Sequence, residues 1–218
     1  MSATPIGSVS HATPVFHITH VENIASMART GQLHCDSECA ADENVNPVSI
    51  AYEDLKLRRS QWRVDKAQGG TLADYVPFYY APRSPMLYVI SRGYVSGYAG
   101  GQAEVAHLVC NAQELARPGE FVITDGHAAT PLTTQFDQLN HLDQVDWQVM
   151  QSRYWFDTDD DGDRKRRRQA EFLVWRSVPF DAVRAIGVMT ATVADRVSRA
   201  LAGAQHTPEL LVRPRWYY

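Results

Sequence analysis

Residues 164–175 read RKRRRQAEFLVW, and this stretch decides how the rest of the chain is interpreted. A dense basic run, Arg164–Arg168, is followed by Gln-Ala and then by one carboxylate, Glu171. The apolar segment Phe172–Trp175 that comes next has the composition of a β-strand. The pattern therefore predicts a single acid at the head of a strand, directly after a cluster of positive charge.

The basic run itself has two interpretations. It is either a patch that follows a phosphate backbone or a solvated face that pairs with the acidic segment Asp157–Asp163 before it, which is the commoner role of a charge run. The acidic segment matches the first ligand positions of a calcium-binding EF-hand loop. Arg168, however, stands where such a loop needs a bidentate glutamate. We therefore expect a mobile acidic loop and no calcium site.

The composition is that of an ordinary globular protein. The 218 residues suit one domain, which we expect over residues 13–218 after a flexible lead-in at residues 1–12. A net charge of −4 means that nucleic-acid binding would need a local patch. No apolar run approaches ~20 residues, so membrane insertion and export are not expected. Three cysteines fit a reducing cytoplasm, and their spacing lacks the second ligand pair of a zinc site, so no metal is expected.

Short apolar segments separated by turn residues predict an α+β fold rather than alternating strands and helices. Strands are expected at Val15–Thr19, Val76–Ala81, Leu87–Ser91, Val105–Val109, Phe121–Thr124, Phe172–Trp175, Ala185–Met189 and Leu210–Arg213. Helices are expected from Thr19 to Gly31, at Ile50–Arg59, as two short pieces within Thr133–Tyr154, and at Ala194–Leu201.

Three local signals refine these expectations. Thr19 and Glu22 match a capping box, so Thr19 is predicted as the N-cap of the first helix and Gly31 as its end. Pro77 cannot donate to a strand ladder, which predicts an edge or bulged strand. Residues 35–49 are small, acidic and contain Asn and Pro, which indicates a loop.

Several motifs, in this order and at this spacing, resemble the DarT family of DNA ADP-ribosyltransferase toxins. They are HITH at 17–20, YVPFY at 75–79, PRSPMLY at 82–88, GGQ at 100–102, TDGH at 124–127 and QAEFLV at 169–174, with WYY at the C-terminus. The resemblance runs from about Thr13 to Tyr218. It implies the ADP-ribosyltransferase fold, in which two short, roughly perpendicular β-sheets and surrounding helices enclose an NAD cleft.

The resemblance also implies an activity and partners. The family transfers ADP-ribose from NAD, as co-substrate, to a base of single-stranded DNA, which is thymine at ring N3 in its best-known branch. It is a cytoplasmic toxin paired with a DarG-type macrodomain antitoxin, and neither a metal nor a membrane is implied. Other acceptors, namely guanine, RNA or protein, stay open, as does a catalytically silent nucleic-acid-binding module.

Site residues follow from the resemblance position by position. Glu171 matches the catalytic glutamate, Arg59 the active-site arginine and His127 a histidine near the reacting base. His17, Thr19 and Tyr79 match positions that line the NAD site. Residues from about 153 to 169 match the loop that contacts the acceptor; its candidate DNA contacts are Arg153, Tyr154, Arg164, Arg166 and Arg167. Taken alone, each of these residues would have an ordinary structural or surface role.

Overall fold

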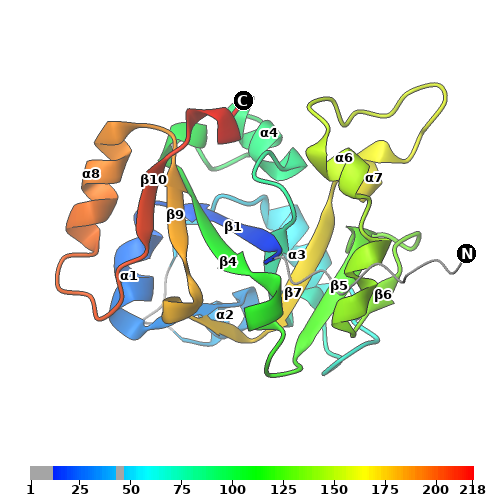
Figure 1. Cartoon of the computed structure of the whole chain (residues 1–218), viewed down its shortest axis with the longest axis horizontal. Coiled ribbons are helices and arrows are strands. Elements are labelled where there is room, and N and C mark those ends of the chain that lie inside the picture. Colours follow the sequence, from blue (N-terminus) through cyan, green and yellow to red (C-terminus); the bar gives the residue numbers. More distant parts are fainter. Residues whose placement is uncertain (1–11, 43–46) are drawn as a thin grey trace, which may run out of the picture.

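The computed structural model describes residues 12–42 and 47–218, which fold around an eight-stranded sheet (Figure 1). The strands are β1 (Pro14–His20), β2 (Gln32–His34), β3 (Tyr75–Tyr79), β4 (Val105–Asn111), β5 (Phe121–His127), β6 (Gln135–Phe136), β7 (Ala170–Trp175), β8 (Ser177–Pro179), β9 (Ala185–Val188) and β10 (Glu209–Val212). The large sheet has the order β10-β9-β4-β1-β3-β7-β5-β6, and β2 pairs with β8 in a separate small sheet.

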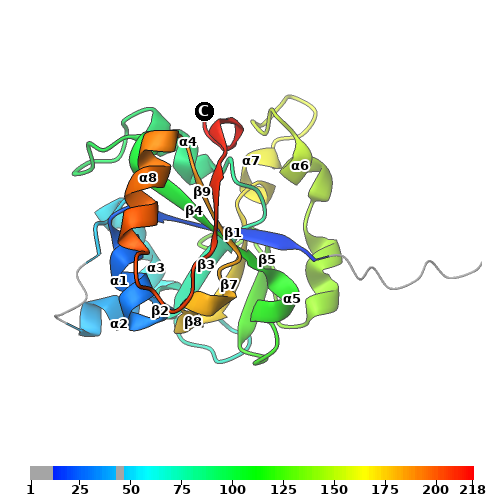
Figure 2. The ribbon, with the colours of Figure 1, turned by 60° about the vertical axis from the view of Figure 1, so that its left-hand side comes forward.

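Helices surround this sheet. The α-helices are α1 (Asn23–Thr30), α2 (Asp36–Ala41), α3 (Glu53–Gln61), α4 (Pro85–Ser91), α5 (Ala112–Leu115), α6 (Trp147–Gln151), α7 (Arg164–Arg167) and α8 (Ala191–Ala200). The 3-10 turns are η1 (Leu72–Asp74), η2 (Gln102–Glu104), η3 (Leu139–Gln144), η4 (Phe180–Ala182) and η5 (Pro214–Trp216). Figures 1 and 2 show α1 and α8 together on one flank and α6 and α7 on the opposite side, where α7 contacts β5.

The large sheet is pinched between β1 and β3. β1 pairs with β4 along its whole length and β3 pairs with β7 along its own, but β1 and β3 share only the pair Phe16 and Tyr79. Pro77, in the middle of β3, presents its carbonyl to the ring of His17 at 2.9 Å. The sheet therefore divides into two four-stranded halves, β10-β9-β4-β1 and β3-β7-β5-β6, in agreement with the predicted pair of short sheets.

The predicted edge position of Pro77 is wrong. β3 lies between β1 and β7, and Pro77 faces Leu173 in the ladder with β7. A residue without an N–H is tolerated inside the sheet because the ladder on the β1 side is reduced to a single pair, so little backbone pairing is lost there.

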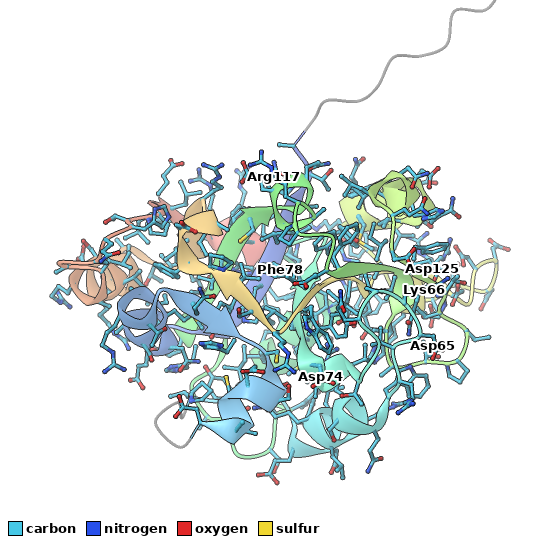
Figure 3. The ribbon with its side chains drawn as sticks, turned by 90° about the horizontal axis from the view of Figure 1, so that it is seen from below. Asp65, Lys66, Asp74, Phe78, Arg117 and Asp125 are labelled. Carbon is cyan, nitrogen blue, oxygen red and sulfur yellow. The ribbon has the colours of Figure 1, made fainter. Side chains whose placement is uncertain are left out.

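β7 carries the key carboxylate into the interior. Phe172 and Leu173 are both fully buried and belong to two different core clusters, because successive strand residues face opposite sides of a sheet. Phe78 of β3 pairs with Phe172 and lies in the interior in Figure 3. Since both faces of β7 are covered, Glu171 is only 2% exposed although it heads the strand.

Most predicted strands are confirmed within one or two residues, but the start of the first helix is wrong. β1 continues through His20, and α1 begins only at Asn23, with no side-chain cap hydrogen bond. The ladder with β4 extends along all of β1, so tertiary pairing outweighs the local capping signal at Thr19. The predicted end is confirmed: Gly31 has a left-handed φ of 73°, and its N–H donates to the Met27 carbonyl at 2.9 Å.

Two further elements differ from the prediction. The predicted strand Leu87–Ser91 is part of helix α4, because Ser84 caps the helix by accepting the Leu87 N–H at 3.1 Å and Pro85 occupies its first turn. Within the predicted loop at 35–49, residues 36–41 form α2, while residues 43–46 lie outside the described residues. Residues 1–11 of the predicted lead-in also lie outside them.

Candidate active site

A buried ion pair marks the centre of the site. Arg59, in the last turn of α3, donates from Nη1 to Glu171 Oε2 at 2.9 Å and from Nη2 to the Leu72 carbonyl at 3.4 Å. The two charged side chains are only 9% and 3% exposed. They are 112 residues apart in the sequence. The structure thus brings together the two residues on which the predicted chemistry depends.

The surroundings keep Glu171 ionised. Burial alone would raise the pKa of its carboxyl, but the charge of Arg59 and the contact with His127 lower that pKa to about 2. Oε1 accepts the Ala128 N–H at 3.3 Å and lies 3.8 Å from His127 Nδ1. A carboxylate held in this way is prepared to bind a hydroxyl and to stabilise positive charge nearby.

An irregularity in β5 brings His127 to the carboxylate. Ile123 pairs with Phe172 and His127 pairs with Ala170, so three residues of β5 lie opposite Glu171 alone. This is a β-bulge with two extra residues, and bulges often re-aim side chains beside active sites. Here it places the ring of His127 and the next backbone N–H on the same carboxylate oxygen.

A cavity of about 460 Å³ adjoins the ion pair. His17, Thr19 and Tyr79, the three residues predicted for the NAD site, all line it, and so does Arg59. Glu171 is not among its described lining residues, so Arg59 links the cavity to the carboxylate. Burial, and then the charge of Glu171, raise the pKa of Tyr79, whose phenol therefore stays protonated.

His17 presents a defined tautomer to this cavity. Its Nδ1 lies 2.9 Å from the Pro77 carbonyl, which can only accept, so Nδ1 carries the proton and Nε2 is an acceptor. Burial lowers the pKa of His17, and the ring is neutral at pH 7.

Asn23 is a site residue that the sequence did not reveal. Its side chain accepts the Val48 N–H at 2.8 Å and donates at 3.0 Å to both the Val48 carbonyl and the Thr19 hydroxyl. Val48 belongs to the segment 47–51 that lines the cavity. Asn23 thereby fixes one wall of the cavity to β1. An asparagine at a helix start carries no sequence signal for such a long-range role.

The basic run forms α7, and two of its arginines are engaged in ion pairs. Arg166 and Arg167 pair with aspartates from four positions, Asp125, Asp146, Asp161 and Asp163, at 2.5 to 3.6 Å. Pairing between the run and the preceding acidic segment is therefore confirmed for these two arginines. The acidic loop is tied to α7 and to the start of α6.

The other arginines of this region differ in exposure. Arg168 is 4% exposed and donates to backbone carbonyls of α6, the segment after it and the segment before α4: Val149, Met150, Ser152 and Arg83. Arg164 donates to the Tyr154 carbonyl at 2.8 Å. Arg153 and Tyr154 are exposed, and the Arg153 guanidinium lies 5.6 Å from the Tyr154 ring centroid. These two side chains face solvent.

Two negative findings apply to residues 12–42 and 47–218. In this part of the chain, no three His, Cys, Asp or Glu side chains are grouped so that they could hold a metal ion. In the same residues, no helix is long and apolar enough to cross a membrane.

Comparisons with known proteins agree with this geometry. The family model described as "ssDNA thymidine ADP-ribosyltransferase, DarT" matches residues 16–218. A DNA ADP-ribosyl transferase of Thermus sp. (strain 2.9) is 37% identical over 209 residues, which cover 94% of this chain and 96% of that protein.

Solved structures of the Thermus sp. 2.9 protein are similar as well. The structure of its complex with ADP-ribosylated single-stranded DNA has a TM-score of 0.85 and 36% identity, and the match covers 95% of this chain and 97% of that one. Its complex with NAD+ has a TM-score of 0.83 and 34% identity, over 97% and 100% of the two chains. A more distant relative from Thermosipho africanus, 26% identical over 86% of this chain and 45% of its own length, is a fusion of a DNA ADP-ribosyl transferase with a DNA ADP-ribosyl glycohydrolase.

Proposed function

The chain belongs to the DarT family and is an NAD-dependent ADP-ribosyltransferase of single-stranded DNA; from this premise we propose that its acceptor is a thymine base and that Glu171, Arg59 and His127 carry the transfer. One observation carries the proposal. The ionised, buried Glu171 is paired with Arg59, and Arg59 lines a cavity whose other walls include the residues matched to the NAD site.

The cavity residues suit NAD. His17 offers a neutral acceptor at Nε2, and Tyr79 offers a protonated phenol and an aromatic ring. The hydroxyl of Thr19 is oriented by the Asn23 amide. Bound here, NAD supplies an activated C1′–N bond whose leaving group, nicotinamide, departs as a neutral molecule with the bonding electron pair.

Glu171 stabilises the charge that this departure creates. Its carboxylate accepts a hydrogen bond from a ribose hydroxyl and faces the positive charge that develops on the ribose as the C1′–N bond breaks. It acts electrostatically and forms no bond to C1′. The Ala128 N–H and Arg59 hold its two oxygens in place, so little reorganisation is needed during the reaction.

Arg59 and His127 act on the acceptor side. The new bond joins C1′ to N3 of thymine, and the N3 proton must leave. The Arg59 guanidinium can bind carbonyl oxygen of the base and stabilise negative charge on the ring. His127 lies beside Glu171 and is placed to receive or relay the proton. An unstacked base is required, which explains the use of single strands.

The DNA strand is proposed to cross the exposed part of the loop at about 153–169. Tyr154 is 67% exposed and offers a surface on which a base can stack, while Arg153 and Arg164 offer positive charge for phosphates. Arg166 and Arg167 also belong to this predicted contact region, but their ion pairs with aspartates reduce the charge that they can offer a phosphate.

The Thermosipho fusion supports a partner for this enzyme. That protein joins a DNA ADP-ribosyl transferase to a DNA ADP-ribosyl glycohydrolase in one chain. We therefore propose that this chain is a toxin whose modification is removed by a DarG-type macrodomain antitoxin. The proposal places the enzyme in the cytoplasm, where both of its substrates, NAD and DNA, are found.

A direct assay tests the proposed acceptor. Purified protein is incubated with NAD and matched oligonucleotides of single-stranded DNA, duplex DNA and RNA, and the added mass is located by base with tandem mass spectrometry. We expect one ADP-ribose on thymine of single-stranded DNA, and about 10²–10³-fold slower formation of this product with Glu171→Gln. Modification of guanine, of RNA or of a protein would replace thymine as the acceptor.

A further inference from the structure

Arg166 is held from two sides by hydrogen bonds. Its Nε and Nη2 donate to the two carboxylate oxygens of Asp163, both at 2.7 Å. Its Nη1 donates to Asp125 at 3.0 Å and to the Thr133 hydroxyl at 3.2 Å. The guanidinium therefore bridges the acidic loop, through Asp163, to β5, through Asp125, and is only 18% exposed.

The same guanidinium packs on the backbone of β5. A Cβ atom added to Gly126 would lie 2.2 Å from Arg166 Nη1 and 2.9 Å from its Cζ. Distances this short are not compatible with a side chain at position 126 unless Arg166 moves. Because the hydrogen bonds of Arg166 restrain it, glycine is the residue that this contact requires.

These contacts fall on the bulge of β5. Thr124, Asp125 and Gly126 are the three residues that lie opposite Glu171 alone. The hydroxyl of Thr124 accepts the Glu171 N–H at 2.9 Å and donates to the Gly126 carbonyl at 2.7 Å. Asp125 and Gly126 are the two bulge residues that Arg166 contacts. The bulge is thus fixed by β7 on one side and by Arg166 on the other.

We propose that Arg166 is a positioning residue: through the bulge at 124–126 it sets the position of His127 and of the Ala128 N–H on Glu171, and it does not contact a DNA phosphate. The inference rests on the proposed roles of Glu171 and His127. It assigns this arginine of the basic run to the rate of transfer rather than to DNA affinity.

The physical reason is the geometry of the carboxylate. Both contacts of Glu171 Oε1, with the Ala128 N–H and His127, come from residues directly after the bulge. If the bulge relaxes, both contacts shift together. Misplacement of a catalytic group by about 1 Å can lower a rate by about 10²-fold. Loss of a phosphate contact would instead weaken DNA binding and reduce its dependence on salt.

A double-mutant cycle tests the proposal. Wild type, Arg166→Ala, Gly126→Ala and the double variant are compared by kcat, by KM for single-stranded DNA and NAD, and by the salt dependence of the DNA KM. Arg166→Lys tests whether one ammonium can replace the guanidinium that links Asp163 to Asp125. Lys165→Ala is the control, because it removes the same charge from an exposed position in the same run.

We expect each single variant to lower kcat by roughly tenfold to 10²-fold. Neither should change the salt slope of the DNA KM, and the double variant should be little worse than either one, because removal of Arg166 frees the space that a Cβ at position 126 needs. Arg166→Lys should rescue poorly, since an ammonium lacks the planar fork that binds both aspartates. Lys165→Ala should keep the kcat of the wild type.

Two outcomes would overturn the inference. One is a salt slope that falls by about 0.7 in Arg166→Ala with kcat unchanged, which is the behaviour of a phosphate contact on a single strand. The other is a double variant whose loss is the product of the single losses. If the wild type itself transferred nothing to single-stranded DNA, the proposed function would fail instead. The coupling between positions 126 and 166 would then be read from the unfolding temperatures of the same four proteins.

Discussion

Two arginine–carboxylate clusters adjoin β5 and β7, and they differ in size and in exposure. The active-site pair, Arg59 and Glu171, is a single buried pair with side chains 9% and 3% exposed. The loop network consists of Arg166 and Arg167 with four aspartates, and its side chains are 18% to 43% exposed. Figure 3 shows Asp125, one of these aspartates, toward the periphery of the molecule.

The difference in burial indicates different roles for the two clusters. Burying a charged pair costs desolvation that its mutual attraction barely offsets, so an isolated buried pair is poorly explained by stability. Partly exposed pairs are each worth about 0–1 kcal/mol, but several together can hold a loop in one conformation. We therefore interpret the active-site pair as chemical machinery and the loop network as its support.

The contribution of Glu171 to the free energy of unfolding depends on pH. The folded-state pKa of Glu171 is lowered to about 2, below the ordinary value of 4.5. A depressed carboxyl pKa adds stability above the unfolded value, and this contribution is lost as the pH falls from about 4.5 through 2.

The largest expected effect comes from removing the charge of Glu171. Glu171→Gln should lower the transfer rate by about 10²–10³-fold, since a preorganised electrostatic stabiliser is lost. Asp161→Asn makes the same chemical change in the loop network and should keep most of the activity. Mass spectrometry of the modified oligonucleotide measures both, and circular dichroism checks the fold. Equal losses in the two variants would remove the distinction between the clusters.

Arg59 is expected to come next. Arg59→Ala should bind NAD normally in calorimetry but lose base modification by roughly 10²-fold, and Arg59→Lys should recover little because a point charge lacks a two-donor fork. Without Arg59, burial raises the pKa of Glu171, so residual activity should be lost at a higher pH than in wild type. If Arg59→Ala bound NAD poorly yet modified DNA normally at saturating NAD, Arg59 would be assigned to NAD binding and not to the acceptor base.

A moderate effect on the salt dependence of the DNA KM should distinguish exposed arginines from ion-paired ones. Arg153→Ala should reduce the log–log slope of the DNA KM against salt by about 0.7, the value for one phosphate contact on a single strand. Arg167→Ala should leave that slope unchanged, because Asp146 and Asp161 already balance its charge. Steady-state assays at several salt concentrations measure the slopes, and the NAD KM should stay constant. A slope change only in Arg167→Ala would reverse the assignment.

The smallest effect is that of salt on local stability. High ionic strength screens exposed pairs more than buried ones. Amide hydrogen exchange in the acidic loop, residues 157–163, should accelerate by at most about fivefold, which corresponds to pairs worth up to about 1 kcal/mol. Exchange at β7 should not change. Faster exchange at β7 than in the loop would mean that the active-site pair is the more exposed cluster.

The sequence predicted strands better than helix starts. β4, β7 and β9 are buried apolar runs whose composition alone indicates strands, and they are found close to where they were expected. Thr19 and the Leu87–Ser91 segment failed for opposite reasons. At Thr19, long-range pairing with β4 outweighs a local cap signal. At Leu87–Ser91, the local helix cap formed by Ser84 and Pro85 outweighs a strand-like composition.

The site was predicted through motifs rather than through residue chemistry. Glu171, Arg59 and His127 were expected from the family resemblance, and the structure brings the three together. Asn23 and the Ala128 N–H were not predicted. Asn23 acts through Val48, which is distant in the sequence. The Ala128 N–H is a backbone group, and the residue type does not show that it has a role. The bulge at 124–126 needs the strand register, which only the fold provides.

The division of the large sheet has a consequence for how the protein is made. Each half combines early and late strands: β1 and β4 lie beside β9 and β10, and β3 lies beside β7. The partner of Arg59, Glu171, is synthesised 112 residues later. During synthesis from the N-terminus, a nascent chain therefore carries the residues of the proposed NAD cavity before it carries Glu171. Because such distant pairing folds slowly, the Arg59–Glu171 pair is completed only after translation has passed β7.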